Sequence, residues 1–189
     1  MNFSTPETSP SNKATGFRQD TLWLRIQAFA LDDPESNLPF SLRLARENGW
    51  SRHYANRAIE EYKKFCYLAL MAGHPVSPSD AVDQAWHLHL IYTRSYWEGF
   101  CSRVLLRPFH HNPSRGGPEE RDKFRGLYEE TLNSYRRIFG VSPPDDIWPS
   151  ADARYAERHA YCRIDTASCW IMPKPRLHLL SWRRKQART

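Results

Sequence analysis

Residues 51–72, "SRHYANRAIEEYKKFCYLALMA", constrain the fold most, because their apolar side chains recur every three or four positions. This spacing gathers apolar side chains on one face of an α-helix and leaves the rest of the helix polar. The stripe comprises Tyr54, Ala58, Ile59, Tyr62, Phe65, Cys66, Ala69 and Leu70. A helix with such a stripe must bury it against other elements, so the remaining segments decide the fold class.

Four further segments repeat the helical spacing: residues 20–30, 39–48, 79–101 and 118–139. Loops rich in Pro and Gly separate them, such as "GHPVSPSD" and "RPFHHNPSRGGPEE". Cap residues fit these boundaries: Asp20 or Thr21, Gly49, and Ser77 or Ser79. No alternating pattern of strand length occurs, so we predict an all-α fold, a single compact bundle of about five helices.

The ends of the chain differ in composition from its middle. Residues 1–16 are rich in Ser, Thr and Pro, and we expect a disordered leader there. The helical domain is predicted for residues 17–150, with Trp148 of "PPDDIWP" pinning the last segment to the core. Residues 151–189 are predicted to be a partly ordered basic tail with one short helix near 152–160.

The net charge of +6 lies entirely in that tail. Residues 1–171 hold 21 basic and 21 acidic residues, whereas residues 172–189 hold six basic residues and no acid. A nucleic-acid-binding domain carries its basic surface on the fold, so we expect no nucleic-acid binding through the helical domain. Residues 174–188 fit weak contact with an anionic surface, or simply a solvated tail.

Targeting and redox signals favour the cytoplasm. The cysteines form no CxxC pair, and two of them occupy apolar helical positions, as buried free thiols do. They are Cys66, Cys101, Cys162 and Cys169. The polar N-terminus does not resemble a signal peptide, and no run of about 18 apolar residues predicts a membrane span.

The segment "VDQAWHLHLIYTRSYWEGFC", residues 82–101, carries two histidines two positions apart. A helix turns about 100° per residue, so His87 and His89 point about 160° apart and cannot share one ion. The inward face is predicted to hold Val82, Trp86, His89, Thr93, Tyr96 and Phe100. The opposite side holds Asp83 with His87, in the i, i+4 relation that lets a carboxylate orient an imidazole.

The loop "RPFHHNPSRGG" supplies a second histidine pair, His110 and His111. We expect His89 to meet one of them. Structural alternatives stand beside this: a buried His89 bonded to a backbone carbonyl, an ordinary Asp83–His87 surface pair, or His–His and His–Trp contacts that order the loop.

A metal site needs three or four converging ligands. The candidate ligands for a divalent metal are His87, His89, His110 and His111, with Asp83 as a ligand or outer partner and His74 nearby. His159, Cys162, Cys169 and His178 match no familiar zinc spacing. A phosphate-binding loop and a G-x-S-x-G nucleophile motif are both missing from the sequence.

Five segments, taken in order, resemble the bacterial branch of the glycine-rich domain-containing protein-like family. They are "LPFSLRLARENGWS", "AGHPVSPSDAVDQAWHLHLIYTRSYWEGFC", "LLRPFHHNPSRGG", "LYEETLNSYRRIFG" and "PPDDIWP". The most specific element is V-D-x-x-W-H-x-H, here Val82, Asp83, Trp86, His87 and His89, and Tyr96, Cys101, His111 and Pro113 also fit. The resemblance covers residues 20–149 and implies a compact helical domain, with no assigned activity. The Gly-rich region of plant members is missing here.

Two classes of function follow. The sequence favours a non-catalytic interaction or scaffolding module with a protein partner, because no nucleophile motif, phosphate loop or complete ligand set is evident. The alternative is a metal-binding protein or metal-dependent enzyme that uses the histidine cluster. Its candidate functional residues are Asp83, Trp86, His87, His89, His110 and His111.

Overall fold

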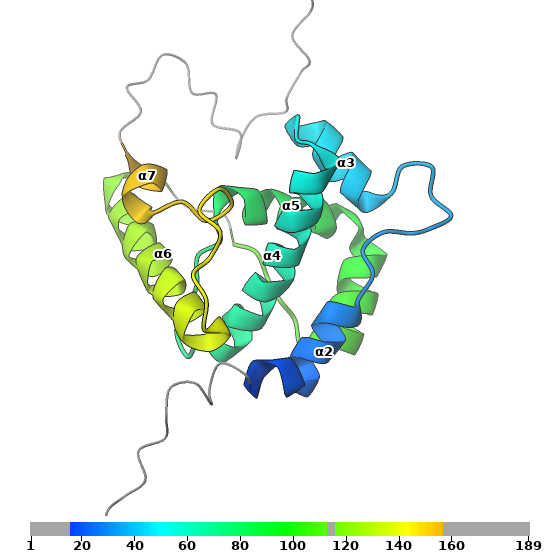
Figure 1. The fold of residues 1–189 in the computed structure, drawn as a ribbon, viewed down its shortest axis with the longest axis horizontal. Coiled ribbons are helices and arrows are strands. Elements are labelled where there is room, and N and C mark those ends of the chain that lie inside the picture. Colours follow the sequence, from blue (N-terminus) through cyan, green and yellow to red (C-terminus); the bar gives the residue numbers. More distant parts are fainter. Residues whose placement is uncertain (1–15, 113–115, 157–189) are drawn as a thin grey trace, which may run out of the picture. The chain divides into compact units, whose positions relative to one another are not determined.

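The segment with the apolar stripe, residues 51–72, forms the central helix of an all-α fold in the computed structural model (Figure 1). The structure describes residues 16–112 and 116–156, and within them it contains helices and no strand. The elements in chain order are η1 (Phe17–Gln19), α2 (Thr21–Ala28), α3 (Phe40–Asn48), α4 (Arg52–Met71), α5 (Asp80–Ile91), η2 (Arg94–Leu105), α6 (Pro118–Phe139) and α7 (Ala151–Tyr155). The predicted all-α class is confirmed. The predicted leader lies almost wholly outside the described residues, as does the tail beyond Ala156.

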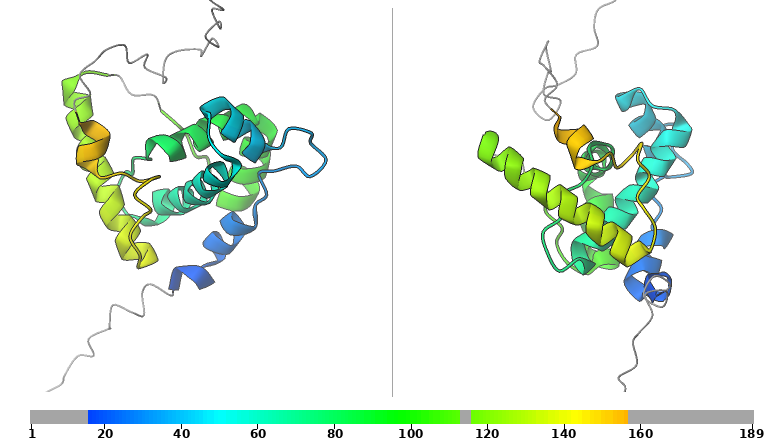
Figure 2. Two further views of the ribbon diagram at one scale, coloured as in Figure 1. Left: turned by 45° about the horizontal axis from the view of Figure 1, so that its top comes forward. Right: turned by 60° about the vertical axis from the view of Figure 1, so that its left-hand side comes forward.

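Helix α4 packs against α2, α3, α5 and α6, and buries side chains on most of its circumference. Figures 1 and 2 show α6 on one side of α4 and α2 on the other. This central position explains why even Glu61 and Lys63 of α4 are buried.

Local sequence signals fix the helix ends as expected. The Asp20 carboxylate accepts a hydrogen bond from the Leu22 amide at 2.7 Å, and the Ser79 hydroxyl accepts one from the Val82 amide at 3.3 Å. Gly49 ends α3 with a φ of +69°, a conformation that glycine adopts without steric cost. The capping chemistry therefore sets where α5, the helix with the histidine pair, begins.

The single helix predicted over residues 79–101 is wrong in one respect, because the structure divides it at Tyr92. Helix α5 ends at Ile91, Tyr92 leaves the helical conformation with a ψ of +63°, and η2 then continues as π-helical turns. The Tyr92 ring packs edge-on against Phe40 of α3, at 5.5 Å between centroids, a contact that local periodicity does not encode. As a result Thr93, expected on the inward face, is exposed, while Tyr96 and Phe100 are buried as predicted.

The segment after α6 is held by Trp148, as predicted. Its indole is buried, and its Nε1 donates to the Glu61 carboxylate at 3.0 Å. Lys64 and the Tyr135 hydroxyl also donate to Glu61, at 2.7 and 3.3 Å, so this buried charge is fully engaged. Beyond it α7, assigned to the tail by sequence, packs against α6 (Figure 2).

Candidate functional site

Helix α5 presents Asp83 and His87 one turn apart on its outer side. Asp83 lies in the first turn, where the helix dipole favours a carboxylate. The Asp83 Oδ2 atom lies 3.8 Å from His87 Nδ1, so the predicted i, i+4 pair is present. The helix geometry thus provides two adjacent ligand-type side chains with no contribution from the core.

The loop after η2 is fastened to α5 by Trp86. The Phe109 ring stacks on the Trp86 indole, with centroids 4.4 Å apart and an interplanar angle of 9°. The Trp86 Nε1 donates to the Tyr96 hydroxyl at 2.9 Å, and that hydroxyl donates in turn to the Phe109 carbonyl. These contacts fix the backbone two residues before His111, which limits where its imidazole can lie.

His111 completes a three-residue group with Asp83 and His87. Its Nε2 lies 2.8 Å from Asp83 Oδ1, and its ring centroid lies 4.5 Å from that of His87. One ligand atom from each of the three residues lies within 4.8 Å of the others. Within the described part of the chain they form the only group of three or more His, Cys, Asp or Glu side chains that meets this condition.

The group is compact enough to suit a metal ion. Ligand atoms about 2.1 Å from a tetrahedral zinc ion lie about 3.4 Å from one another. The two carboxylate oxygens of Asp83 face different histidines, with Oδ1 at 2.8 Å from His111 and Oδ2 at 3.8 Å from His87. One ligand atom from each of the three residues lies within 4.8 Å of the other two, which is near the spacing that coordination requires.

The charge state of His87 also suits coordination. Burial lowers the pKa of this imidazole below its ordinary value of 6.5; the neighbouring Asp83 carboxylate opposes this effect, and His111 adds to it. A neutral imidazole keeps a lone pair for a metal, so the lowered pKa favours the ligating form at neutral pH.

His89, predicted to point inward, is completely buried. Its Nδ1 is hydrogen-bonded to the Tyr62 hydroxyl at 3.0 Å and its Nε2 to the Ser95 hydroxyl at 3.3 Å. Burial lowers its pKa to about 3. The expected meeting of His89 with His110 or His111 is wrong, because His111 joins Asp83 and His87 instead. The backbone carbonyl expected as its partner is replaced by two hydroxyl groups.

The other candidate histidines also lie outside the group. The His110 ring packs on Trp97, with centroids 5.4 Å apart. His74 is hydrogen-bonded to the Pro75 carbonyl at 2.8 Å and to the Ser134 hydroxyl on α6 at 2.7 Å. The expected His–His and His–Trp contacts are therefore present between the loop and the preceding helices. Two of the four candidate histidine ligands, His89 and His110, have separate environments.

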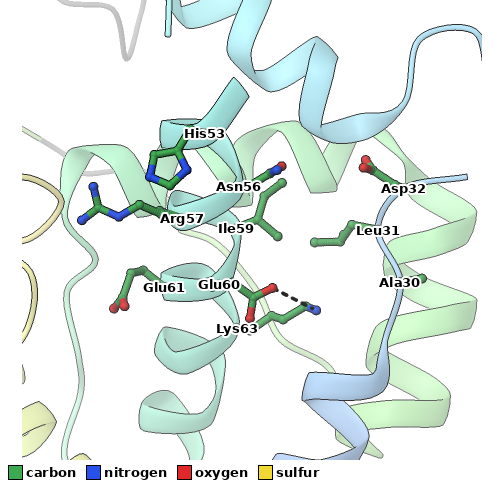
Figure 3. A pocket seen from close by; sticks show the side chains of 10 residues that line it. All are labelled: Ala30, Leu31, Asp32, His53, Asn56, Arg57, Ile59, Glu60, Glu61 and Lys63. Atoms are coloured by element: carbon green, nitrogen blue, oxygen red, sulfur yellow. Dashed lines mark ion pairs between the residues drawn. The ribbon is translucent and has the colours of Figure 1, made fainter. Parts of the chain in front are cut away.

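An open pocket of about 490 Å³ lies between α4 and the segment after α2 (Figure 3). Its charged side chains already have partners within the protein. Arg57 pairs with both carboxylate oxygens of Asp146 at 2.6 and 2.7 Å, and Asp32 accepts two hydrogen bonds from Ser41 at the start of α3. Lys63 donates to the Gln27 carbonyl at 3.1 Å. The pocket therefore offers less unused binding capacity than the Asp83–His87–His111 group.

All three residues of this group were among the candidates from sequence, but helical periodicity paired only two of them. The i, i+4 relation identified Asp83 with His87, whereas the contact of His111 with Asp83 spans 28 residues. The signal that points to it is the Phe109 two residues earlier, an aromatic partner for Trp86 in a loop otherwise composed of turn formers.

Among residues 16–112 and 116–156, no helix combines the length and the apolar character needed to cross a membrane.

Comparison with known proteins assigns the chain to a family. No curated protein and no solved structure matches the chain. The model of the UCP032817-like family matches residues 38–135, more than half of the chain, from the start of α3 to near the end of α6. This span includes Asp83, His87 and His111, and the chain belongs to the UCP032817-like family.

Proposed function

We propose that the protein binds a divalent transition-metal ion through Asp83, His87 and His111. The observation that carries this proposal is the convergence of three ligand atoms, two imidazole nitrogens and one carboxylate oxygen, within 4.8 Å. Isolated pairs of this kind are common on helices, but a third side chain delivered by a separately anchored loop is not needed for helix stability.

The donor set favours Zn²⁺ or a neighbouring transition metal over Mg²⁺ or Ca²⁺. Magnesium and calcium prefer oxygen ligands, whereas imidazole suits Zn, Fe, Ni and Cu. Two histidines and one carboxylate are the ligands of several catalytic zinc centres, and they also form the facial triad of non-haem iron enzymes. Zinc is the first ion to test because it needs no reductant to remain divalent.

One of the two imidazoles, that of His111, is already held in place by packing. The His111 ring is covered by the Trp86 indole, with centroids 4.4 Å apart, and Trp86 is itself buried. Fixed rings reduce the entropy lost when the ion binds, which supports affinity.

The test is metal analysis of protein purified without a histidine tag, followed by calorimetric titration with Zn²⁺. We expect one ion per chain. His87→Ala and His111→Ala should each weaken zinc binding by more than about 100-fold, beyond the loss typical of an outer partner. His110→Ala is the matched control, because His110 lies on the same loop, and it should leave the affinity unchanged.

If the protein is instead the interaction or scaffolding module predicted from sequence, we expect the opposite outcome in these experiments. It requires no stoichiometric metal, no thermal shift with Zn²⁺, Fe²⁺ or Ni²⁺, and equal behaviour of the His111 and His110 variants. That outcome would remove the metal proposal and leave the loop contacts as purely structural.

We also propose a finer placement of the chain within its family and its cell. The V-D-x-x-W-H-x-H signature and its downstream residues support membership of the bacterial branch of the glycine-rich domain-containing protein-like family. Cys66 and Cys101 support a reducing compartment such as the cytoplasm, because both are buried free thiols.

A further inference from the structure

We propose that the metal ion held by Asp83, His87 and His111 keeps an exchangeable coordination position, which accepts a small anion or a substrate carboxylate. This inference rests on the proposed metal binding and goes beyond it. An ion whose coordination positions are all filled by protein ligands would only fasten the loop to α5. An ion with an exchangeable position can bind and activate a further ligand.

The number of protein ligands is the first argument. Structural zinc sites are usually closed by four protein ligands, whereas catalytic sites use three and leave a position for water or substrate. In the part of the chain that the structure describes, the group contains three ligand residues. His89 on α5 and His110 on the loop after η2 make their contacts elsewhere.

The second argument is the direction of exposure. The side chains of His87, Asp83 and His111 are 38, 26 and 18% exposed. Trp86, only 6% exposed, covers one side of His111, and the α5 backbone lies beneath Asp83 and His87. Protein therefore covers the inner side of the group, and all three side chains keep an exposed part through which a further ligand could reach a bound ion.

The third argument is charge. A divalent ion with one carboxylate and two neutral imidazoles carries a net charge of +1. The acidic residue one turn earlier on α5, Asp80, lies 3.1 Å from an Arg154 nitrogen, and this ion pair reduces its influence. The local balance therefore attracts an anionic oxygen or nitrogen ligand more strongly than a neutral one.

Cobalt-substituted protein tests this directly, with azide as the probe. Co²⁺ replaces Zn²⁺ in such sites, and its visible absorption bands report the coordination number and ligands. We expect the full-length chain to bind one Co²⁺ and its visible bands to change saturably on addition of one azide per cobalt. The His110→Ala protein should respond identically.

The possible failures are separable. If Co²⁺ and Zn²⁺ do not bind, the proposed function itself fails. If Co²⁺ binds but its bands do not respond to azide, the metal site stands and the exchangeable position is refuted. A thiolate-to-cobalt charge-transfer band before azide is added would also refute it, because a cysteine such as Cys162 or Cys169 would then fill the position.

Discussion

The two faces of α5 place the same residue type in opposite environments. His89 points into the core, where two hydroxyl groups satisfy both of its ring nitrogens and no solvent reaches it. His87, two residues earlier, is partly exposed and lies beside a carboxylate and a second imidazole. The comparison teaches that a histidine with both nitrogens engaged in the core acts as a structural polar group, whereas a partly exposed histidine beside other ligand-type groups retains binding capacity.

The largest expected difference between the faces is in the stability of the metal-free protein. His89→Leu should lower the free energy of unfolding by about 3 kcal/mol, because it leaves the buried Tyr62 hydroxyl without its partner and disturbs packing against Phe40 and Phe100. His87→Leu should change it by less than about 0.5 kcal/mol. Urea unfolding followed by circular dichroism measures both, and equal losses would erase the proposed division.

The pH dependence of stability gives a second, smaller contrast. His89 has a pKa of about 3 in the folded protein against an ordinary value of 6.5, so the unfolded chain binds more protons between these values. The free energy of unfolding should therefore fall as the pH falls through 6.5, by about 2 kcal/mol between pH 7 and pH 5. His89→Leu should lack this component, while His87→Leu should keep it, because that variant leaves His89 and its burial unchanged. A His89→Leu protein with an unchanged pH profile would show that the burial of His89 is not responsible.

Trp86 lies on the buried face of α5 but also contacts His111, so its replacement should affect both stability and zinc binding. Trp86→Phe keeps a ring for stacking on Phe109 but removes the Nε1 donor to the Tyr96 hydroxyl. We expect a loss of about 1.5 kcal/mol in the free energy of unfolding. Zinc affinity should fall by about tenfold, because His111 is then held less firmly. Unfolding and zinc titrations on the same preparation test both numbers, and an unchanged zinc affinity would show that the Trp86 clamp does not position His111.

The division between the faces of α5 was predictable because it depends only on local geometry. A rotation of about 100° per residue separates His87 from His89 wherever the helix lies, and the Ser79 cap sets the helix start. The break at Tyr92 was not predictable in this way, since it coincides with the packing of Tyr92 on Phe40 of α3.

The contact of His111 with Asp83 and His87 was beyond local reasoning for a similar reason, although His111 was a candidate ligand. The course of the loop before His111 is fixed by the stack of Phe109 on Trp86 and by the Tyr96 hydroxyl bond to the Phe109 carbonyl. Periodicity predicts which face a residue occupies, but it does not predict which distant loop will cover that face.

Asp83, like His87, gives a small expected effect on stability, and it gives the most direct test of what the outer face of α5 does. Asp83→Asn keeps an oxygen acceptor near His111 but removes the negative charge from the first turn of α5 and from the pair with His87. Interactions of this kind at partly exposed positions are weak, so the metal-free protein should lose only about 0.5 kcal/mol of unfolding free energy. Zinc binding should nevertheless weaken by more than about 100-fold, because a neutral amide is a poor replacement for a charged ligand.

Chemical unfolding of the metal-free variant, paired with a zinc titration, separates the change in stability from the change in zinc affinity. A large loss of stability with unchanged zinc affinity would assign Asp83 to the structural role that His89 fulfils on the opposite face, and the functional difference between the two faces would disappear.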